Sequence, residues 1–208
     1  HAFPVPYHPP VLVIPDVFSP DFCRWLIEQF ETRGNEPSGT LRMSEGKMVH
    51  VTDGETKRRR DHHVVDKDLL DAIGCRMERR VLPEIQRAYH SQIRFVEEFK
   101  IVRYDADIGG FFRPHRDNTA MGTAHRRFAM TLNLNTEDHE GGELRFPEYG
   151  HASYRPATGE AAIFSCNLLH EATDVTKGSR YVLLSFMYDQ SGQDLMERVR
   201  KAEAQHNG

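Results

Sequence analysis

From residue 92 onward, apolar and polar residues alternate in short runs that are separated by turn residues. A two-residue period is the pattern of a half-buried β-strand, and closely spaced strands of this kind pair antiparallel. These runs do not alternate with helical segments, as a parallel sheet would require. The pattern therefore predicts an antiparallel sandwich or barrel. The strand candidates are 93–105, 126–135, 140–147, 159–166 and 180–189.

Residues 19–90 have a helical character instead. Ser19 is a good N-cap for a helix that Gly34 ends, and a second amphipathic helix is expected from about 67 to 89. Pro83 should break or kink this second helix, because proline has no N–H to donate.

The segment between these helices, residues 34–60, is polar and rich in glycine, and it ends in the basic run KRRR. We expect a long mobile loop here, which is either a lid over a functional site or a disordered segment.

Together these segments predict one domain over residues 1–208. Helical support covers about 19–90, a β core covers about 92–189, and a polar helical tail covers 190–208. The first residue is His1 rather than Met. We therefore expect the chain to be excised from a longer one, and a redoxin-like domain is a candidate for the upstream part.

The composition excludes several classes of protein. Apolar residues make up 38% and charged residues 28% of the 208, which is typical of a globular chain rather than a disordered one. A net charge of −4 gives no general attraction to nucleic acid or anionic membranes. No apolar run approaches the length of a membrane span. The three cysteines are too far apart for a CxxC site or a disulfide framework, so we expect a cytoplasmic protein.

One strand candidate, 126–135, has two different faces. Its even positions are large and apolar, as a core face requires. Its odd positions, Ala129, Thr131, Asn133 and Asn135, are small and mostly polar. Such a face either meets solvent or lines a wet cavity inside a barrel, and the strand alone favours solvent.

The segment FFRPHRDN places His115 and Asp117 two residues apart. On an extended backbone, both side chains then point to the same side. An imidazole and a carboxylate aimed at one point can be a surface pair, half of an acid–base dyad, or two of three metal ligands. The pattern alone is weak, because a chain with 12 histidines produces chance matches.

Two downstream residues favour the metal site. His170 ends the strand-like run AAIFSCNLLH, far enough from Asp117 for two strands and two turns to return the chain beside His115. Two imidazoles and one carboxylate form the facial triad that leaves open positions on Fe(II). Arg180 opens the last strand candidate, and its guanidinium fork suits the far carboxylate of a dianionic keto acid.

With these motifs in this order, the chain resembles the iron(II)/2-oxoglutarate-dependent oxygenases of the prolyl 4-hydroxylase type. The resemblance covers roughly residues 95–189. It implies a mainly β fold with flanking helices and a double-stranded β-helix core, also called a jelly roll or cupin-like fold. It also implies Fe(II), 2-oxoglutarate and dioxygen as cofactors, with ascorbate as a further candidate. The segments on which the resemblance rests are KIVRYDADIGGFFRPHRDN, RRFAMTLNLN, EGGELRFPEYG and YRPATGEAAIFSCNLLHEATDVTKGSRYVLLSF.

The resemblance also implies roles for individual residues. His115, Asp117 and His170 would hold Fe(II) and form the catalytic set. Arg180 would bind the distal carboxylate of 2-oxoglutarate. Collagen-type prolyl hydroxylases usually carry lysine at that position, so the match is closer to the bacterial and oxygen-sensing branches. The last strand reads RYVLLSF and lacks the arginine-rich signature of the nucleic-acid demethylases.

Two further residues match co-substrate contacts of the family. Tyr104 matches a residue that hydrogen-bonds the distal carboxylate, and Asn133 matches a contact on the neighbouring strand. With Asn133 in this role, the small polar face of 126–135 is expected to line a cavity rather than to meet solvent.

The implied function is hydroxylation of an unactivated C–H bond, prolyl-hydroxylase-like, in a peptidyl, free amino-acid or other small-molecule substrate. One alternative is a cupin-like metal enzyme that does not use 2-oxoglutarate, and Arg180 and Tyr104 argue against it. Another is a non-catalytic binding module, and the complete ligand set argues against that. No nucleic-acid or membrane partner is expected.

Other charged residues receive structural interpretations. Arg126 lies where it can meet a substrate at a pocket mouth or remain solvated. His125, His139 and His151 fall in turns and are expected to be exposed.

Overall fold

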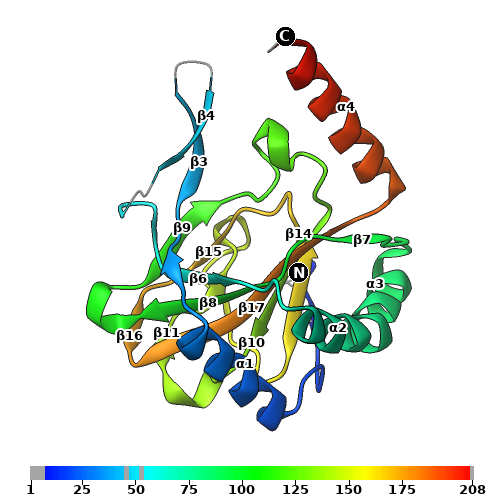
Figure 1. The fold of residues 1–208 in the computed structure, drawn as a ribbon. Coiled ribbons are helices and arrows are strands. Elements are labelled where there is room, and N and C mark those ends of the chain that lie inside the picture. The colour runs from blue at the N-terminus through cyan, green and yellow to red at the C-terminus, as the bar shows by residue number, and fades with distance from the viewer. Residues whose placement is uncertain (1–7, 45–46, 52–53, 207–208) are drawn as a thin grey trace, which may run out of the picture.

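The computed structural model describes residues 8–44, 47–51 and 54–206, and two antiparallel sheets form the centre of the described chain (Figure 1). The larger sheet contains β1 (Leu12–Ile14), β2 (Glu36–Pro37), β6 (Arg60–His63), β7 (Phe95–Val96), β8 (Lys100–Asp105), β10 (Phe128–Asn133), β14 (Ala161–Ser165) and β17 (Ser179–Tyr188). The smaller sheet contains β5 (Lys57–Arg58), β9 (Phe111–His115), β12 (Leu144–Arg145), β13 (Ser153–Tyr154) and β15 (His170–Ala172). Two-stranded pairs are formed by β3 (Thr40–Ser44) with β4 (Lys47–Val51) and by β11 (Glu140–Gly141) with β16 (Val175–Lys177).

The strand order is that of a jelly roll. The larger sheet runs β1-β14-β10-β17-β8-β6-β2, with β7 also paired to β17, and the smaller runs β13-β12-β15-β9-β5. From β8 onward, the chain passes repeatedly between the sheets: β8, β10, β14 and β17 lie in the larger sheet, and β9, β12, β13 and β15 lie in the smaller one. The predicted mainly β fold with flanking helices is confirmed.

The helices surround this β core. They are α1 (Pro20–Thr32), α2 (Lys67–Arg76), the π-helical turn η1 (Met77–Val81), α3 (Leu82–Tyr89) and α4 (Gln190–His206). Short 3₁₀ turns are η2 (Ala106–Ile108), η3 (Met121–Thr123), η4 (Thr136–Asp138) and η5 (Pro147–Tyr149). Among the described residues, no helix is long and apolar enough to cross a membrane.

The predicted start of α1 is confirmed. The Ser19 hydroxyl accepts a hydrogen bond from the Phe22 N–H at 3.3 Å, which satisfies one of the free donors of the first turn. Phe22, Leu26 and Phe30 are buried along one face of the helix and join the core that the larger sheet forms. This face fixes α1 against the sheet.

The predicted kink at Pro83 is also confirmed. The helix over 67–89 is interrupted by η1, where the Leu82 N–H reaches the carbonyl of Met77, five residues back. Pro83 then lies in the first turn of α3, where its missing N–H has no helical partner to lose.

The prediction of a mobile loop over 34–60 is wrong for the described part of that segment. Strands β3 and β4 pair in regular antiparallel register from Thr40↔Val51 to Ser44↔Lys47. The later strands β5 and β6 pair with β9 and β8, which ties the segment to both sheets. The prediction relied on glycine and charge, which do not report pairing with strands far along the chain. Residues 45–46 and 52–53 lie outside the described part.

Two strand boundaries differ from the sequence prediction. The run 93–105 divides into β7 and β8. His170 begins β15 instead of ending the preceding strand, because a turn follows β14, with the Leu168 N–H bonded to the Ser165 carbonyl at 3.0 Å. His170 thus belongs to the smaller sheet, although the apolar run before it belongs to the larger one.

The two faces of β10 separate the core from a cavity. Met130 and Leu132 are buried in the core shared with the helices. Ala129 and Thr131 point the other way and line a cavity between the two sheets. The expectation that the small face lines a cavity is confirmed for these two positions.

Candidate functional site

The paired strands β9 and β15 bring two predicted ligands together. His170 lies opposite His115 in the antiparallel register, and their ring centroids are 4.3 Å apart. Asp117 follows β9 directly, and its N–H donates to the Cys166 carbonyl at 3.1 Å. This bond ties the loop after β9 to the end of β14, so three segments meet at one point.

The three side chains converge closely. The Nε2 of His115 lies 3.4 Å from Oδ1 of Asp117, and the Nε2 of His170 lies 3.3 Å from Oδ2. One possible ligand atom from each residue lies within 4.8 Å of the other two. This spacing suits three ligands on one side of a metal ion.

Backbone carbonyls orient both imidazoles. The Nδ1 of His115 lies 2.8 Å from the Arg113 carbonyl, and the Nδ1 of His170 lies 3.0 Å from the Leu168 carbonyl. Because a carbonyl only accepts, each Nδ1 must carry the proton. The Nε2 lone pairs are then directed at the Asp117 carboxylate, as in metal sites whose histidines are held by a second layer of acceptors.

The charge state of these groups favours a bound cation. Burial lowers the pKa of His170, which keeps its imidazole neutral. Burial alone would raise the pKa of the Asp117 carboxyl, but His170 and His115 hold it below its ordinary value. Two neutral nitrogens and one carboxylate therefore present lone pairs to a shared point, which is the donor set of non-haem Fe(II) sites. The residues fit the metal that the sequence predicts.

The same cavity contains Arg180. The cavity has a volume of about 90 Å³, which is room for several water molecules. Its lining includes the triad, Arg180, Tyr104 and Thr131. Arg180 is only 4% exposed, and within the described residues it forms no ion pair. Burial lowers the pKa of its guanidinium. An unpaired buried guanidinium in a cavity is a site for an anion.

Tyr104 lies beside Arg180. The two residues are cross-strand partners in the β8–β17 pair, and the Arg180 guanidinium is 5.3 Å from the centre of the Tyr104 ring. The Tyr104 hydroxyl accepts a hydrogen bond from Nη1 of Arg59 at 3.1 Å. Its own proton remains free to donate into the cavity.

Asn133 lies behind Arg180 and not among the residues that line the cavity. Its Oδ1 accepts from Nη2 of Arg180 at 3.3 Å, and its Nδ2 donates to Thr136 at 3.1 Å and to the Pro156 carbonyl at 2.7 Å. The structure thus places Asn133 where it orients Arg180.

Thr131 is a site residue that the sequence did not single out. Its hydroxyl is buried and has no hydrogen-bond partner among the described residues. It lies on β10 between Asn133, which contacts Arg180, and Ala129, which packs in the cluster that contains Phe164. Phe164 lies against His170, with ring centroids 4.6 Å apart. Thr131 therefore faces the space between the anion site and the triad.

Arg59 is the second residue that sequence reasoning missed. It lines the cavity, and its guanidinium pairs with the buried Asp61 at 2.9 Å. The run KRRR was interpreted as part of a loop, but Lys57 is buried, Arg58 is exposed, and the two arginines after it are half-buried. Burial lowers the pKa of Lys57 to about 7, with Arg59 adding to the effect. Nothing in the run itself distinguishes Arg59 from its neighbours.

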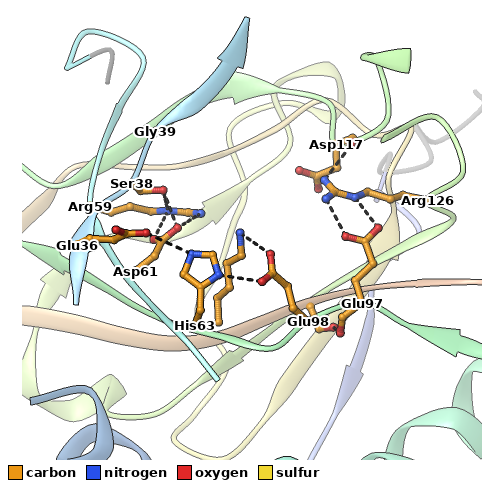
Figure 2. A network of polar contacts seen from close by, with 12 residues as sticks. Glu36, Ser38, Gly39, Arg59, Asp61, His63, Glu97, Glu98, Asp117 and Arg126 are labelled. Atoms are coloured by element: carbon orange, nitrogen blue, oxygen red, sulfur yellow. Dashed lines mark hydrogen bonds and ion pairs between the residues drawn. The ribbon is translucent and has the colours of Figure 1, made fainter. Parts of the chain in front are cut away.

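Arg126 lies at the opposite side of the cavity (Figure 2). Its guanidinium holds both carboxylate oxygens of Glu97 at 2.8 Å and reaches the Asp117 carbonyl at 3.4 Å. Arg126 therefore lines the cavity with its guanidinium held in place by Glu97, and it is not a freely solvated side chain.

The prediction that His125 and His139 are exposed is wrong, whereas His151 is exposed as expected. His125 bonds to Glu97 at 2.9 Å, and the Nδ1 of His139 lies 3.1 Å from the Gly141 carbonyl. The turns that contain His125 and His139 both fold back onto the β core, which could not be predicted from the sequence alone.

Comparisons with known proteins agree with this geometry. Residues 99–188 match the family model described as the 2OG-Fe(II) oxygenase superfamily. The procollagen lysine hydroxylase and glycosyltransferase LH3 of Rattus norvegicus is 34% identical over 103 residues, which are 48% of this chain and 13% of the relative. The corresponding Caenorhabditis elegans protein is 28% identical over 201 residues, 90% of this chain and 26% of the relative. The chain thus spans about a quarter or less of these relatives.

Solved structures share the fold. A Pseudomonas putida prolyl-4-hydroxylase superposes with a TM-score of 0.64 at 16% identity, covering 86% of this chain and 91% of that one. A Trichoplax adhaerens prolyl hydroxylase, solved with a peptide fragment of the hypoxia inducible factor, gives 0.63 at 14% identity and covers 89% and 86%. Residues 99–188 thus resemble the 2OG-Fe(II) oxygenase superfamily, and the jelly-roll fold of the chain is that of the solved prolyl hydroxylases.

Proposed function

We propose that this chain is an Fe(II)- and 2-oxoglutarate-dependent dioxygenase that hydroxylates an unactivated C–H bond of a peptidyl or amino-acid substrate. The observation that carries the proposal is the unpaired, buried guanidinium of Arg180 in the cavity of the His115, Asp117 and His170 triad. An uncompensated buried charge costs several kcal/mol, and a bound dianion offsets this cost. A metal enzyme of the same fold that used no keto acid would not need this cation.

The triad residues would hold Fe(II), which together with 2-oxoglutarate and dioxygen supplies the oxidising power for C–H hydroxylation. The Arg113 and Leu168 carbonyls keep both imidazoles in the ligating tautomer. Phe164 packs against the His170 imidazole, with ring centroids 4.6 Å apart.

Arg180, Tyr104 and Thr131 would bind the co-substrate. The guanidinium of Arg180 pairs with the distal carboxylate, and Asn133 keeps it pointed into the cavity. The free Tyr104 hydroxyl proton and the unpartnered Thr131 hydroxyl supply two donors to the same anion. Hydrogen bonds to charged groups are worth about 1.5–3 kcal/mol each, so both contribute measurably to affinity.

The relatives support a peptidyl substrate. LH3 is named as a procollagen lysine hydroxylase, and the Trichoplax adhaerens enzyme was solved with a peptide. The residue hydroxylated by this chain is accordingly a prolyl or lysyl residue.

The test is an anaerobic titration of the apoprotein with Fe(II) and then 2-oxoglutarate, followed by visible absorption. A charge-transfer band that needs both additions, is absent in His115→Ala and needs much more 2-oxoglutarate in Arg180→Ala would establish the site. If the folded, iron-loaded wild type shows no such band, the result would favour the alternative, a cupin-like metal enzyme that does not use 2-oxoglutarate.

A further inference from the structure

A second cavity adjoins the candidate site. This groove, of about 360 Å³, shares Glu97, Glu98 and Arg126 with the first cavity and continues from it toward the C-terminal helix α4. In Figure 1, α4 rises from the end of β17 and stands beside the turn that contains η3. A free amino acid needs only the first cavity, whereas a longer substrate would extend into the groove.

Several large apolar or aromatic side chains contribute to the walls of the groove. Met196 and Val199 come from one side of α4, Met121 comes from η3, and Tyr188 ends β17. Met121 is 58% exposed, one of the few large apolar side chains left open to solvent in the described chain. An exposed methionine beside a half-buried apolar helix face is typical of a surface that packs against another chain.

The charges of the groove are mostly paired among themselves. Glu97 is paired with Arg126 at 2.8 Å, and Glu98 with Lys100 at 2.9 Å and His63 at 2.8 Å (Figure 2). Both acidic residues of the groove are therefore neutralised by partners that the protein supplies.

Arg200 is different. It is exposed at the α4 wall, and no ion pair or hydrogen bond joins its guanidinium to another described residue. Among the charged residues that line the groove, Arg200 is thus the one whose charge has no partner in the described part of the chain. An acidic side chain would complement it, and an apolar side chain would complement Met121 and Val199.

We propose that this groove binds the part of an extended peptide substrate that flanks the hydroxylated residue, and that it selects an apolar and an acidic side chain there. The inference rests on the proposed function, because the hydroxylated residue must enter the first cavity. It narrows the substrate from an amino acid to a peptide, with α4 setting the sequence preference.

The experiment uses capped peptide pools with a central proline or a central lysine and randomised flanking positions. The full chain is incubated with Fe(II), 2-oxoglutarate and each pool, and hydroxylated peptides are sequenced by mass spectrometry. The variants are Arg200→Glu and its matched control Arg198→Glu. Both arginines are exposed on α4, but Arg198 lies outside the groove and bonds only to the Asp194 carbonyl at 3.2 Å.

The wild type should enrich Asp or Glu at a fixed distance from the hydroxylated residue. Exposed ion pairs are worth about 0.2–1 kcal/mol, so charge reversal at Arg200 should cut this enrichment by roughly 1.4- to 5-fold or turn it toward Lys and Arg. Arg198→Glu should keep the wild-type preference. In Met121→Gln, the preference for an apolar neighbour should weaken while the acidic preference remains.

Equal acidic enrichment in the wild type and Arg200→Glu would overturn the inference, as would identical shifts in both arginine variants. Hydroxylation of free proline or lysine without any peptide product would also overturn it and leave the proposed function standing. Absence of the iron- and 2-oxoglutarate-dependent band in the wild type would overturn the proposed function itself, and the inference with it.

Discussion

His170 lies directly opposite His115 across the β9–β15 pair, next to an irregularity in the register, so strand pairing sets the separation of the two imidazoles. A slip of this pair by one residue would turn one imidazole to the other face of the sheet. The geometry of the candidate metal site therefore depends on the backbone pairing of the smaller sheet.

Metal binding should stabilise the fold through these residues. At a free Fe(II) concentration of one hundred times Kd, the unfolding free energy rises by about 2.7 kcal/mol. For a domain of this size, this corresponds to an increase in Tm of roughly 5–10 °C. Anaerobic thermal melts with and without Fe(II) measure it. His170→Ala should lose most of the shift, and His151→Ala, an exposed control, should keep it. An equal shift in both variants would exclude His170 as a ligand.

The Arg180→Met substitution should affect the folding stability of the apoprotein and its binding of 2-oxoglutarate in opposite directions. The guanidinium is buried without a carboxylate partner, so replacing it with an apolar side chain of similar length removes a desolvation cost. We expect the variant apoprotein to be as stable as the wild type or more stable by about 1–3 kcal/mol, with 2-oxoglutarate binding lost. Urea unfolding and calorimetric titration measure the two effects. A large destabilisation would show that Arg180 has a structural partner instead.

Thr131→Val should weaken 2-oxoglutarate binding about tenfold or more, since it removes one donor to a carboxylate and conserves shape. Thr131→Ser should stay near the wild-type affinity. Pyruvate, which lacks the distal carboxylate, provides the comparison. If Thr131 contacts that carboxylate, the Val variant should bind pyruvate as the wild type does. Equal losses for both keto acids would instead indicate a disturbed metal site.

His139 should make stability depend on pH. Burial, with Arg180 and Arg155 nearby, lowers its pKa in the folded chain to about 4. Its unfolded value is about 6.5, so between these values the unfolded chain binds the extra proton. Stability is thus complete above about pH 6.5 and falls as the pH drops toward 4, by up to about 3 kcal/mol. His139→Gln should flatten this part of the curve in urea unfolding series. An unchanged slope would assign the acid sensitivity to other groups.

The convergence of His115 with Asp117 and the position of Arg180 on a strand were predictable from sequence because both have a local origin. His115 and Asp117 share a face through the two-residue strand period, and Arg180 opens a strand whose pattern is unambiguous. The strands that hold these residues were predicted for the same reason, because their two-residue pattern is local. The helix start at Ser19 and the break at Pro83 likewise follow from single residues with strong backbone preferences.

Arg59 was not predictable, because its role depends on partners in other strands. Only the β6–β8 pairing places its guanidinium between Asp61 and Tyr104. For a similar reason, the sequence could not show which of Asn133 and Thr131 reaches the cavity. Both lie on the small face of β10, but contacts of Asn133 with Thr136 and Pro156 hold it behind Arg180 and leave Thr131 at the cavity surface.

The two cavities draw on different parts of the chain. The triad, Arg180 and Tyr104 come from residues 99–188, while Arg59 of the first cavity comes from the segment before them and Arg200 of the groove comes from the helix after them. The function and the groove proposed above therefore place the chemistry and the selection of the substrate in separate segments. On that proposal, exchanging α4 between related chains would be expected to change the preferred peptide without rebuilding the metal site, which would make this fold a modular starting point for engineered hydroxylation.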